Sequence, residues 1–335
     1  MRAVVLSGPR ICTVEEVPVP VAAPGEVVVD VERAGVCGTD VELFTGELSY
    51  LQTGHSTYPL RPGHEWCGRV REVGAGVDAE WLGRRVMGDT MLGDRTCRRC
   101  RRGQQHVCEQ RQEVGIRGGR AGALAERLAV PAWSLHVLPD SVDEVLGALV
   151  EPGGNAWRAA RATGLGVGDR ALVIGPGTIG LLTAMFLRAA GVQVHLLGVT
   201  GSSLAFARGL GFDDAWTRGT LPAVPFDAVV DASTAAGSPA LAVDLVEPGG
   251  RVVCIGIAGT PSTIDTRTLL LKDVTAVGVL SASPGLAPTI AAYAGGAVDP
   301  RPLVAATVGL QDVAAVLGGQ RPAGAGPKTH VDPRA

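Results

Sequence analysis

The sequence predicts a two-domain α/β protein, in which a β-rich domain accompanies a domain built on a doubly wound parallel sheet. Its 335 residues, of which 46% are hydrophobic, are enough for two buried cores. From residue 155 onward, apolar segments of strand length alternate with helical segments, as in a parallel sheet covered by helices. Residues 1–148 instead contain short, partly alternating segments between Gly and Pro turns, without that rhythm.

The expected elements follow this division in chain order. In the β-rich part, we expect strands at residues 26–32, 68–77 and 123–130. In the parallel sheet, we expect strands at residues 171–174, 192–197, 226–231, 251–255 and 274–279, with helices at residues 178–190 and 203–210. The rhythm is lost after residue 284, so the last segment is expected to return to the β-rich part. The predicted domains are therefore residues 1–148 with 285–335, and residues 149–284.

Charge and cysteine usage narrow the class of protein. The net charge of −3 gives no general attraction to nucleic acid or anionic membranes. Seven cysteines, an odd number in a chain of this size, indicate metal ligation or buried thiols in a reducing compartment, so we expect a cytoplasmic location. The longest apolar stretch, residues 171–187, is broken by Gly and Pro, which favours a strand, a turn and a helix over a membrane span.

A glycine motif follows the first strand of the predicted parallel sheet. Residues 175–180 read Gly-Pro-Gly-Thr-Ile-Gly and fit G-x-G-x-x-G at the start of a helix. The first glycine allows a tight turn, the second lets a pyrophosphate approach the backbone, and the third permits close helix packing. This predicts a Rossmann-type dinucleotide site, and the alternative is an ordinary turn in a glycine-rich chain. The predicted binding residues are Gly175, Gly177, Thr178, Ile179 and Gly180.

The end of the second strand bears on the choice of coenzyme. An NAD site usually carries Asp or Glu there to bind the ribose 2′-hydroxyl, but this position is Gly198. Thr200 and Ser203 can donate hydrogen bonds to a 2′-phosphate, and Arg218 can reach it from the side. No Arg follows Gly198 directly. NADP(H) is therefore favoured slightly over NAD(H), and the alternative is a plain turn glycine in a protein that uses NAD.

Two short segments carry possible metal ligands. Residues 35–40 contain Cys37, and residues 63–65 read Gly-His-Glu, with His64 and Glu65. Cys, His and carboxylate side chains are suitable zinc ligands, and a catalytic zinc keeps one position open for water or substrate. Considered alone, a buried Cys and a surface His remain the simpler interpretation.

These motifs together resemble those of the zinc-containing medium-chain dehydrogenases, which act on alcohols, polyols, threonine and glucose. The matching segments occur in the family's order and spacing over essentially the whole chain; they are residues 35–40, 62–65, 83–86, 97–108, 149–152 and 175–180. The resemblance implies a GroES-like catalytic domain and a Rossmann domain. It also implies a zinc-dependent transfer of hydride between a secondary alcohol and NAD(P).

The resemblance assigns roles around the catalytic zinc. It implies that Cys37, His64 and Glu151 are zinc ligands, that Glu65 reaches the zinc directly or through water, and that Asp40 orients the ligand histidine. Two further roles concern the proton released by the substrate. Thr39 matches the hydroxyl that passes this proton onward, and Glu42 stands at the outer position of the relay, which is often His. For Glu42 and Glu65, a structural ion pair is the alternative.

A second cluster implies a structural zinc. Asp94, Cys97, Cys100 and Cys108 stand where the family has four cysteines, and Asp94 replaces the first. Carboxylate oxygen can ligate zinc, so a site with three sulfurs and one oxygen is expected, and the alternative is a lobe that has lost its metal. Five arginines around the cysteines raise the alternative of a nucleic-acid-binding zinc knuckle. It is disfavoured because no aromatic residues are interleaved.

The substrate is expected to be polar. Residues 46–61, between the two ligand motifs, include Glu47, Ser49, Gln52, Ser56 and Thr57, which suit a polyol, a sugar or an (amino)cyclitol. If these residues face solvent instead, a simpler secondary alcohol is the alternative. A zinc-free quinone or enoyl reductase and a non-enzymatic NADP(H)-binding sensor are rival functions. The expected assembly is a homodimer or homotetramer without nucleic-acid or membrane partners.

Overall fold

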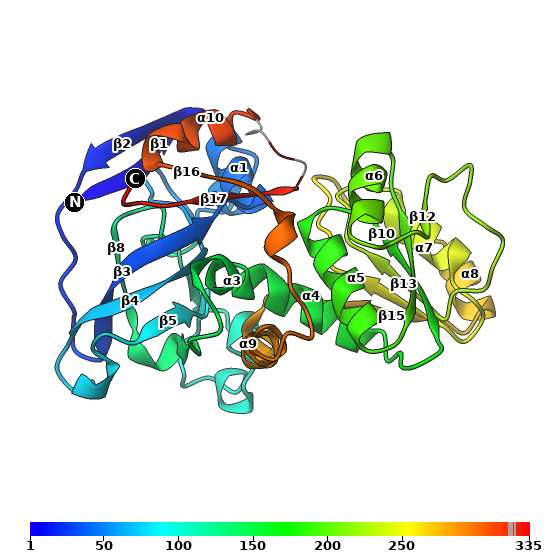
Figure 1. Ribbon diagram of the computed structural model, residues 1–335, viewed down its shortest axis with the longest axis horizontal. Helices are drawn as coiled ribbons and strands as arrows, with labels where there is room; N and C mark the ends of the chain where they lie inside the picture. Colours follow the sequence, from blue (N-terminus) through cyan, green and yellow to red (C-terminus); the bar gives the residue numbers. More distant parts are fainter. Residues whose placement is uncertain (321–323, 325) are drawn as a thin grey trace. The chain divides into compact units, whose positions relative to one another are not determined.

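The computed structural model describes residues 1–320, 324 and 326–335, and these form two compact units. The first unit comprises Met1–Glu151, Ile290–Ala294 and Leu303–Ala335, and the second comprises Pro152–Thr289 and Gly295–Pro302. Figure 1 shows the elements of both units. Among the helices of the described residues, none is long and apolar enough to cross a membrane.

A seven-stranded sheet forms the core of the first unit. Its order is β16-β17-β3-β4-β5-β9, and β8 also pairs with β3, along residues 26–30. The strands are β3 (Glu26–Gly35), β4 (Glu65–Val73), β5 (Arg85–Gly88), β8 (Arg127–Pro131), β9 (Leu135–Val137), β16 (Val304–Val308) and β17 (Lys328–Val331). Because β17 pairs with β3, the end of the chain completes this sheet, and His330 lies opposite Gly35.

Short strands and helices surround this sheet. Two further strand pairs are β1 (Arg2–Gly8) with β2 (Ile11–Glu16), and β6 (Met91–Leu92) with β7 (Gln112–Glu113). The helices of this unit are α1 (Gly38–Thr45), α2 (Ser49–Gln52), α3 (Glu144–Ala148) and α10 (Val313–Leu317). The residues of α4 (Val150–Ala162) and α9 (Leu286–Ala294) are divided between the units. Alternate valines of β3 pack with Trp66 and Leu128 in the core.

A six-stranded parallel sheet forms the second unit, in the order β12-β11-β10-β13-β14-β15. Its strands are β10 (Arg170–Ile174), β11 (Gln193–Leu197), β12 (Ala215–Trp216), β13 (Ala228–Asp231), β14 (Arg251–Cys254) and β15 (Thr275–Gly278). The order reverses between β10 and β13, which is the switch point of a doubly wound sheet. β12 was not predicted from the sequence, because it is only two residues long.

Helices join the parallel strands of the second unit (Figure 1). They are α5 (Thr178–Ala189), α6 (Gly201–Gly209), α7 (Ser238–Leu245) and α8 (Thr266–Leu271). Apolar runs such as Ala-Leu-Val-Ile in β10 form strands because helices cover both faces of a parallel sheet. The predicted fold class, a doubly wound parallel sheet with a β-rich domain, is therefore confirmed.

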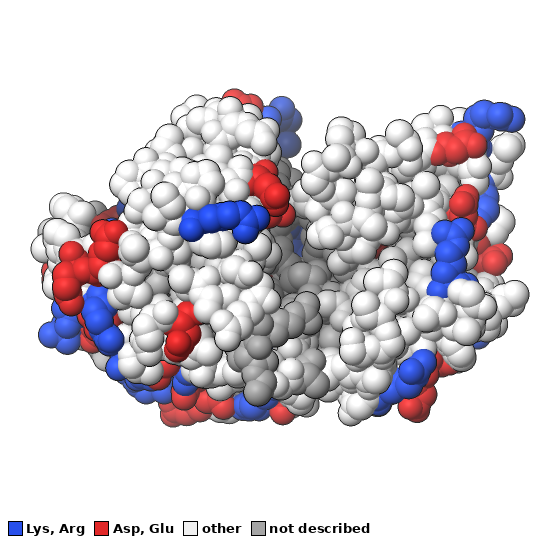
Figure 2. Space-filling view, turned by 90° about the horizontal axis from the view of Figure 1, so that it is seen from above, with Lys and Arg blue, Asp and Glu red and all other residues white. Residues whose placement is uncertain are grey.

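Charged side chains are mixed in sign over the visible surface. In Figure 2, Lys and Arg side chains lie beside Asp and Glu in both units, and much of the surface is uncharged. This agrees with the small net charge of −3.

Candidate metal and coenzyme sites

The first candidate metal group lies where β3 ends and β4 begins. Cys37 is the N-cap of α1, just after β3, and Glu65 is the first residue of β4, directly after His64. Gly35 and Glu65 are register partners, so pairing of the two strands brings these segments together. One ligand atom from each of Cys37, His64 and Glu65 lies within 4.8 Å of the other two.

Asp40 fixes both ligand-bearing segments and is completely buried. Its Oδ2 accepts a hydrogen bond from the Cys37 N–H at 2.9 Å, and its Oδ1 accepts one from the Gly63 N–H at 3.1 Å. The Nδ1 atom of His64 lies 3.6 Å from Oδ1 of the same carboxylate. Asp40 is therefore placed to hold both backbones beside the imidazole, and its orienting role toward His64 stays a prediction.

A buried lysine, which the sequence analysis missed, contacts this metal group. Nζ of Lys328 in β17 lies 2.8 Å from each carboxylate oxygen of Glu65 and donates to the Val36 carbonyl at 3.0 Å. Both side chains are almost fully buried. The sequence feature that could have drawn attention to this residue is composition, because Lys328 is one of only two lysines among 30 basic residues.

Glu151 lies outside the three-residue metal group. It stands in the first turn of α4 and is 7% exposed. Neither group of potential ligand atoms that lie within 4.8 Å of one another among the described residues contains Glu151. The ligand role of Glu151 therefore remains a prediction, as do the roles of the other candidate site residues.

The two residues expected to carry the proton lie on α1. Thr39 and Glu42 are three positions apart, so they share one face of the helix. Both are partly buried. Burial and the nearby Glu47 raise the pKa of the Glu42 carboxyl. A carboxyl group with a raised pKa is better suited to exchanging protons near neutral pH.

The second candidate metal group comprises the four residues expected to hold a structural zinc. Ligand atoms of Asp94, Cys97, Cys100 and Cys108 all lie within 4.8 Å of one another. Oδ1 of Asp94 accepts hydrogen bonds from the N–H groups of Thr96 and Cys97. Sγ of Cys97 lies 3.8 Å from Sγ of Cys108. Two sulfurs of a tetrahedral zinc with Zn–S bonds of about 2.3 Å are separated by about 3.8 Å, so this cluster fits the metal.

Arginines of this loop contact the protein itself. The Arg95 guanidinium stacks over the Trp133 ring at 5.3 Å, Arg99 pairs with Glu109 at 2.7 Å, and Arg101 donates to the Thr96 carbonyl. Two of these contacts lie within the loop, and the contact with Trp133 joins it to the rest of the unit.

The glycine motif has the backbone that a dinucleotide site needs. Gly175 has a φ of +92°, which permits the turn after β10. A Cβ atom on Gly180 would lie 1.9 Å from the Gly175 carbonyl oxygen, so the helix packs against the turn too closely for a side chain. A Cβ on Gly177 would meet nothing within 4 Å, which leaves room for a phosphate at the start of α5, where Thr178 and Ile179 follow.

Close packing also favours glycine at position 198, independently of the coenzyme. A Cβ at this position would lie 2.9 Å from Cγ of Pro176 and 3.0 Å from the Leu204 side chain. Thr200 caps α6 and exchanges hydrogen bonds with Ser203, and both are accessible. Arg218 lies in the turn after β12. The next residue after the glycine, Val199, is 96% exposed.

Some polar residues of segment 46–61 make hydrogen bonds within the first unit, and others line a cavity. Tyr50 donates to Glu113 at 3.0 Å and accepts from Arg111 at 2.9 Å, which ties α2 to the strand β7. Ser56 and Thr57 help line a cavity of about 600 Å³ in the first unit. The residues that line this cavity do not include those of the metal groups.

Comparison with known proteins places this architecture in a family. The alcohol dehydrogenase GroES-like domain matches residues 23–140, and the zinc-binding dehydrogenase domain matches residues 178–293. An L-threonine 3-dehydrogenase of Sinorhizobium fredii is 31% identical over 83% of both chains, and one of Rhizobium rhizogenes is 29% identical over 93% of both. The chain belongs to the zinc-dependent medium-chain alcohol dehydrogenases. The resemblance inferred from the motifs is thus confirmed.

A solved structure supports the same assignment for this zinc-dependent dehydrogenase. A zinc-binding dehydrogenase from Sinorhizobium meliloti 1021, solved with bound NADP, superposes with a TM-score of 0.90, at 27% identity and 99% coverage of both chains. The protein is an NAD(P)-dependent alcohol dehydrogenase with a GroES-like domain and a Rossmann domain. The sulfur, imidazole and carboxylate donors of the first group, and the sulfur and carboxylate donors of the second, suit the zinc that the family uses.

Proposed function

We propose that this dehydrogenase transfers hydride between a secondary alcohol of a polar substrate and NADP(H), with a polyol, a sugar or an (amino)cyclitol as the substrate class. The group of Cys37, His64 and Glu65, whose backbone segments are held by Asp40, carries the proposal. The L-threonine 3-dehydrogenase relatives are named for a substrate in which the hydroxyl neighbours charged groups. The polar side chains of segment 46–61 add less support, because Glu47, Ser49, Gln52 and Thr57 are exposed in the structure. A simpler secondary alcohol is the second candidate.

The residues divide the chemistry between them. Cys37, His64 and Glu151 would hold the catalytic zinc, with Glu65 beside it. When bound, zinc supplies a Lewis acid that makes an alcohol easier to deprotonate near neutral pH. Thr39 would take the substrate's hydroxyl proton and pass it to Glu42 on the same face of α1. Residues 175–180 would bind the coenzyme pyrophosphate, so that the nicotinamide accepts the hydride.

The second group would hold a structural zinc. Asp94, Cys97, Cys100 and Cys108 supply three sulfurs and one oxygen, and the S–S distance of 3.8 Å suits tetrahedral coordination. In this proposal the zinc organises the loop, and the chemistry takes place at Cys37 and His64.

The preference for NADP(H) rests on charge and on hydroxyl groups. No carboxylate stands at Gly198 to repel a 2′-phosphate, and Thr200, Ser203 and Arg218 follow it in sequence. The expected preference is modest, because no Arg follows Gly198 directly.

A substrate screen tests this function. Purified protein with measured zinc content is assayed in both directions with polyols, cyclitols, ketoses and simple secondary alcohols, using NAD(H) and NADP(H). We expect the highest kcat/KM with a polar substrate and NADP(H). Higher activity with simple alcohols would support the second candidate. Coenzyme binding without turnover on any member of these classes would favour the NADP(H)-binding sensor.

We also propose a cytoplasmic homodimer or homotetramer. The strand β15 lies at the edge of its sheet, and the neighbouring Leu270 and Leu271 of α8 are strongly exposed. An open strand edge next to apolar side chains is suited to pairing with a second copy. Light scattering after size exclusion should give a dimer or tetramer, and Leu271→Asp should weaken it. The seven free thiols fit a reducing compartment.

A further inference from the structure

Lys328, the buried partner of Glu65, has no role in the chemistry derived so far. Glu65 is 1% exposed and Lys328 is 3% exposed. The carboxylate belongs to the metal group, yet both of its oxygens lie 2.8 Å from the same ammonium. A buried carboxylate needs a cation, and two cations compete for this one, namely Lys328 and a zinc held by Cys37 and His64.

The geometry around the pair is specific to lysine. An ammonium has three donors, and the structure provides three acceptors, which are the two oxygens of Glu65 and the carbonyl of Val36. Arginine has five donors and a flat, wider head, so it would leave donors unpaired in this space. The chain uses lysine at this position although only Lys272 and Lys328 are lysines among its 30 basic residues.

The backbone of β3 passes close to the Glu65 carboxylate. A Cβ atom on Gly35 would lie 2.1 Å from Oε2 of Glu65, so only glycine leaves room at this position of β3. Nζ of Lys328 also holds the carbonyl of Val36, the residue before Cys37. Through this bond β17, near the end of the chain, is tied to the loop that carries a metal ligand.

We propose that Lys328 is a positioning residue that holds the Glu65 carboxylate away from full coordination of the zinc and so keeps one coordination position open for substrate. The proposal rests on the metal site of the proposed function. Without the ammonium, a zinc held by Cys37 and His64 becomes the cation beside the Glu65 carboxylate. The carboxylate then binds the zinc more tightly and competes with the substrate for the open position.

The test is a double-mutant cycle read out by zinc affinity. The variants Lys328→Met, Glu65→Gln and the double variant are prepared as full-length protein, and zinc affinity is measured by competition with a chromogenic chelator. Two zinc-binding steps are expected. The step that Cys100→Ser weakens belongs to the cysteine cluster, and the other step reports zinc binding at Cys37 and His64. We expect Lys328→Met to tighten that other step by about tenfold or more and to lower kcat by a similar factor. In the Glu65→Gln background, the same change should alter zinc affinity less than about threefold.

Controls separate this role from a purely structural one. Lys272, the only other lysine, caps the end of α7 through the carbonyls of Val243, Asp244 and Val246. Lys272→Met should lower stability and leave zinc affinity unchanged. Lys328→Arg retains the charge and should recover part of the wild-type kcat.

The outcomes are distinguishable. An equal change of zinc affinity, or none, on Lys328→Met with and without Glu65→Gln would overturn the positioning role, because Lys328 would then not act through Glu65. If the wild-type protein lacks a zinc-binding step outside the cysteine cluster, the proposed function itself fails.

Discussion

At the scale of single residues, one buried carboxylate, Asp40, holds the two backbone segments that carry the metal group. Asp40 has no exposed surface, and its two oxygens are used by two backbone N–H groups. Each such bond to a charged acceptor contributes about 1.5–3 kcal/mol, which is enough to fix both ligand-bearing segments before a metal arrives. Cys37 and His64 are thus placed by the fold itself.

Cys37→Ala tests whether this group performs the chemistry. Loss of the thiolate should lower kcat/KM by about a thousandfold, because the Lewis acid contributes several kcal/mol to the transition state. Zinc content should fall by about one equivalent per chain. The matched control is Cys12→Ala in β2, whose thiol has a pKa of about 11 because burial disfavours the thiolate. Near-normal turnover of Cys37→Ala would remove the proposed mechanism.

Val199→Arg tests the coenzyme preference more cleanly than a substitution at Gly198. An aspartate at Gly198 would place Cβ 2.9 Å from Pro176, so its effect would combine charge with crowding. Val199 is 96% exposed and follows directly. A new arginine there can pair with a 2′-phosphate, which is worth about 1.5–3 kcal/mol, or about tenfold or more in the NADP(H)/NAD(H) ratio of kcat/KM.

Val167→Arg is the control for that experiment. Val167 is also strongly exposed in the second unit, but it precedes β10 and lies at the opposite end of the strands from Val199. It should leave the coenzyme ratio unchanged. An equal shift in both variants would show that added positive charge acts over long range, and that the 2′-phosphate is not bound near residue 199.

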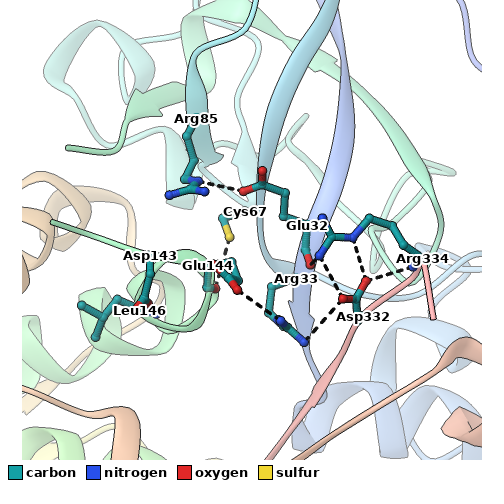
Figure 3. Close-up of polar contacts among 9 residues, drawn as sticks. All are labelled: Glu32, Arg33, Cys67, Arg85, Asp143, Glu144, Leu146, Asp332 and Arg334. Carbon is teal, nitrogen blue, oxygen red and sulfur yellow. Dashed lines mark hydrogen bonds and ion pairs between the residues drawn. The ribbon is translucent and has the colours of Figure 1, made fainter. Parts of the chain in front are cut away.

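At the scale of elements, a chain of ion pairs connects α3, β3 and the residues after β17 (Figure 3). Arg33 of β3 lies 3.5 Å from Glu144 of α3 and 3.9 Å from Asp332. Arg334 pairs with Asp332 at 2.8 Å. The thiol of Cys67 donates to the Glu144 carbonyl at 3.3 Å, and burial raises its pKa, which fits a structural role.

Arg33→Met tests how strongly this network holds those elements together. The side chain of Arg33 is only about one-tenth exposed, and removing it leaves Glu144 and Asp332 without their shared cation. We expect a loss of about 2 kcal/mol in the free energy of unfolding, or a Tm lower by about 4–8 °C. Arg71→Met removes an exposed ion pair to Asp30 in the same sheet and should change stability by less than about 0.5 kcal/mol. Calorimetry measures the Tm of both variants. Equal losses of stability would show that burial of the ion-pair network does not matter.

At the scale of the whole molecule, the sequence predicted the parts whose signals are local. The strand, glycine turn and helix at residues 170–189 were visible because each has its own pattern of apolar residues and glycines. The proximity of Cys37, His64 and Glu65 was inferred only through family resemblance, because it depends on the register of β3 against β4. Lys328 was missed because it lies 263 positions from its partner Glu65 and has no motif of its own.

Acid stability is the last prediction, and it concerns the folded molecule as a whole. His330 in β17 is fully buried, and neither ring nitrogen has a hydrogen-bond partner among the described residues. Burial, with Lys328 and Arg33 nearby, lowers the pKa of His330 from 6.5 to about 3. Between these values the unfolded chain binds a proton that the folded chain does not, so stability falls as the pH drops from 6.5 toward 3.

His330→Leu should remove this contribution. The imidazole adds a slope of up to about 1.4 kcal/mol per pH unit in that window, and leucine has no proton to bind. Because the ring has no hydrogen-bond partner, its replacement orphans no other group, and stability at pH 7 should change little. Denaturant unfolding at several pH values from 7 to 4.5 should therefore show a flatter profile for the variant. The exposed His55 in the same unit provides the control, since His55→Leu should retain the wild-type profile. Parallel profiles for wild type and His330→Leu would mean that other groups set the acid sensitivity.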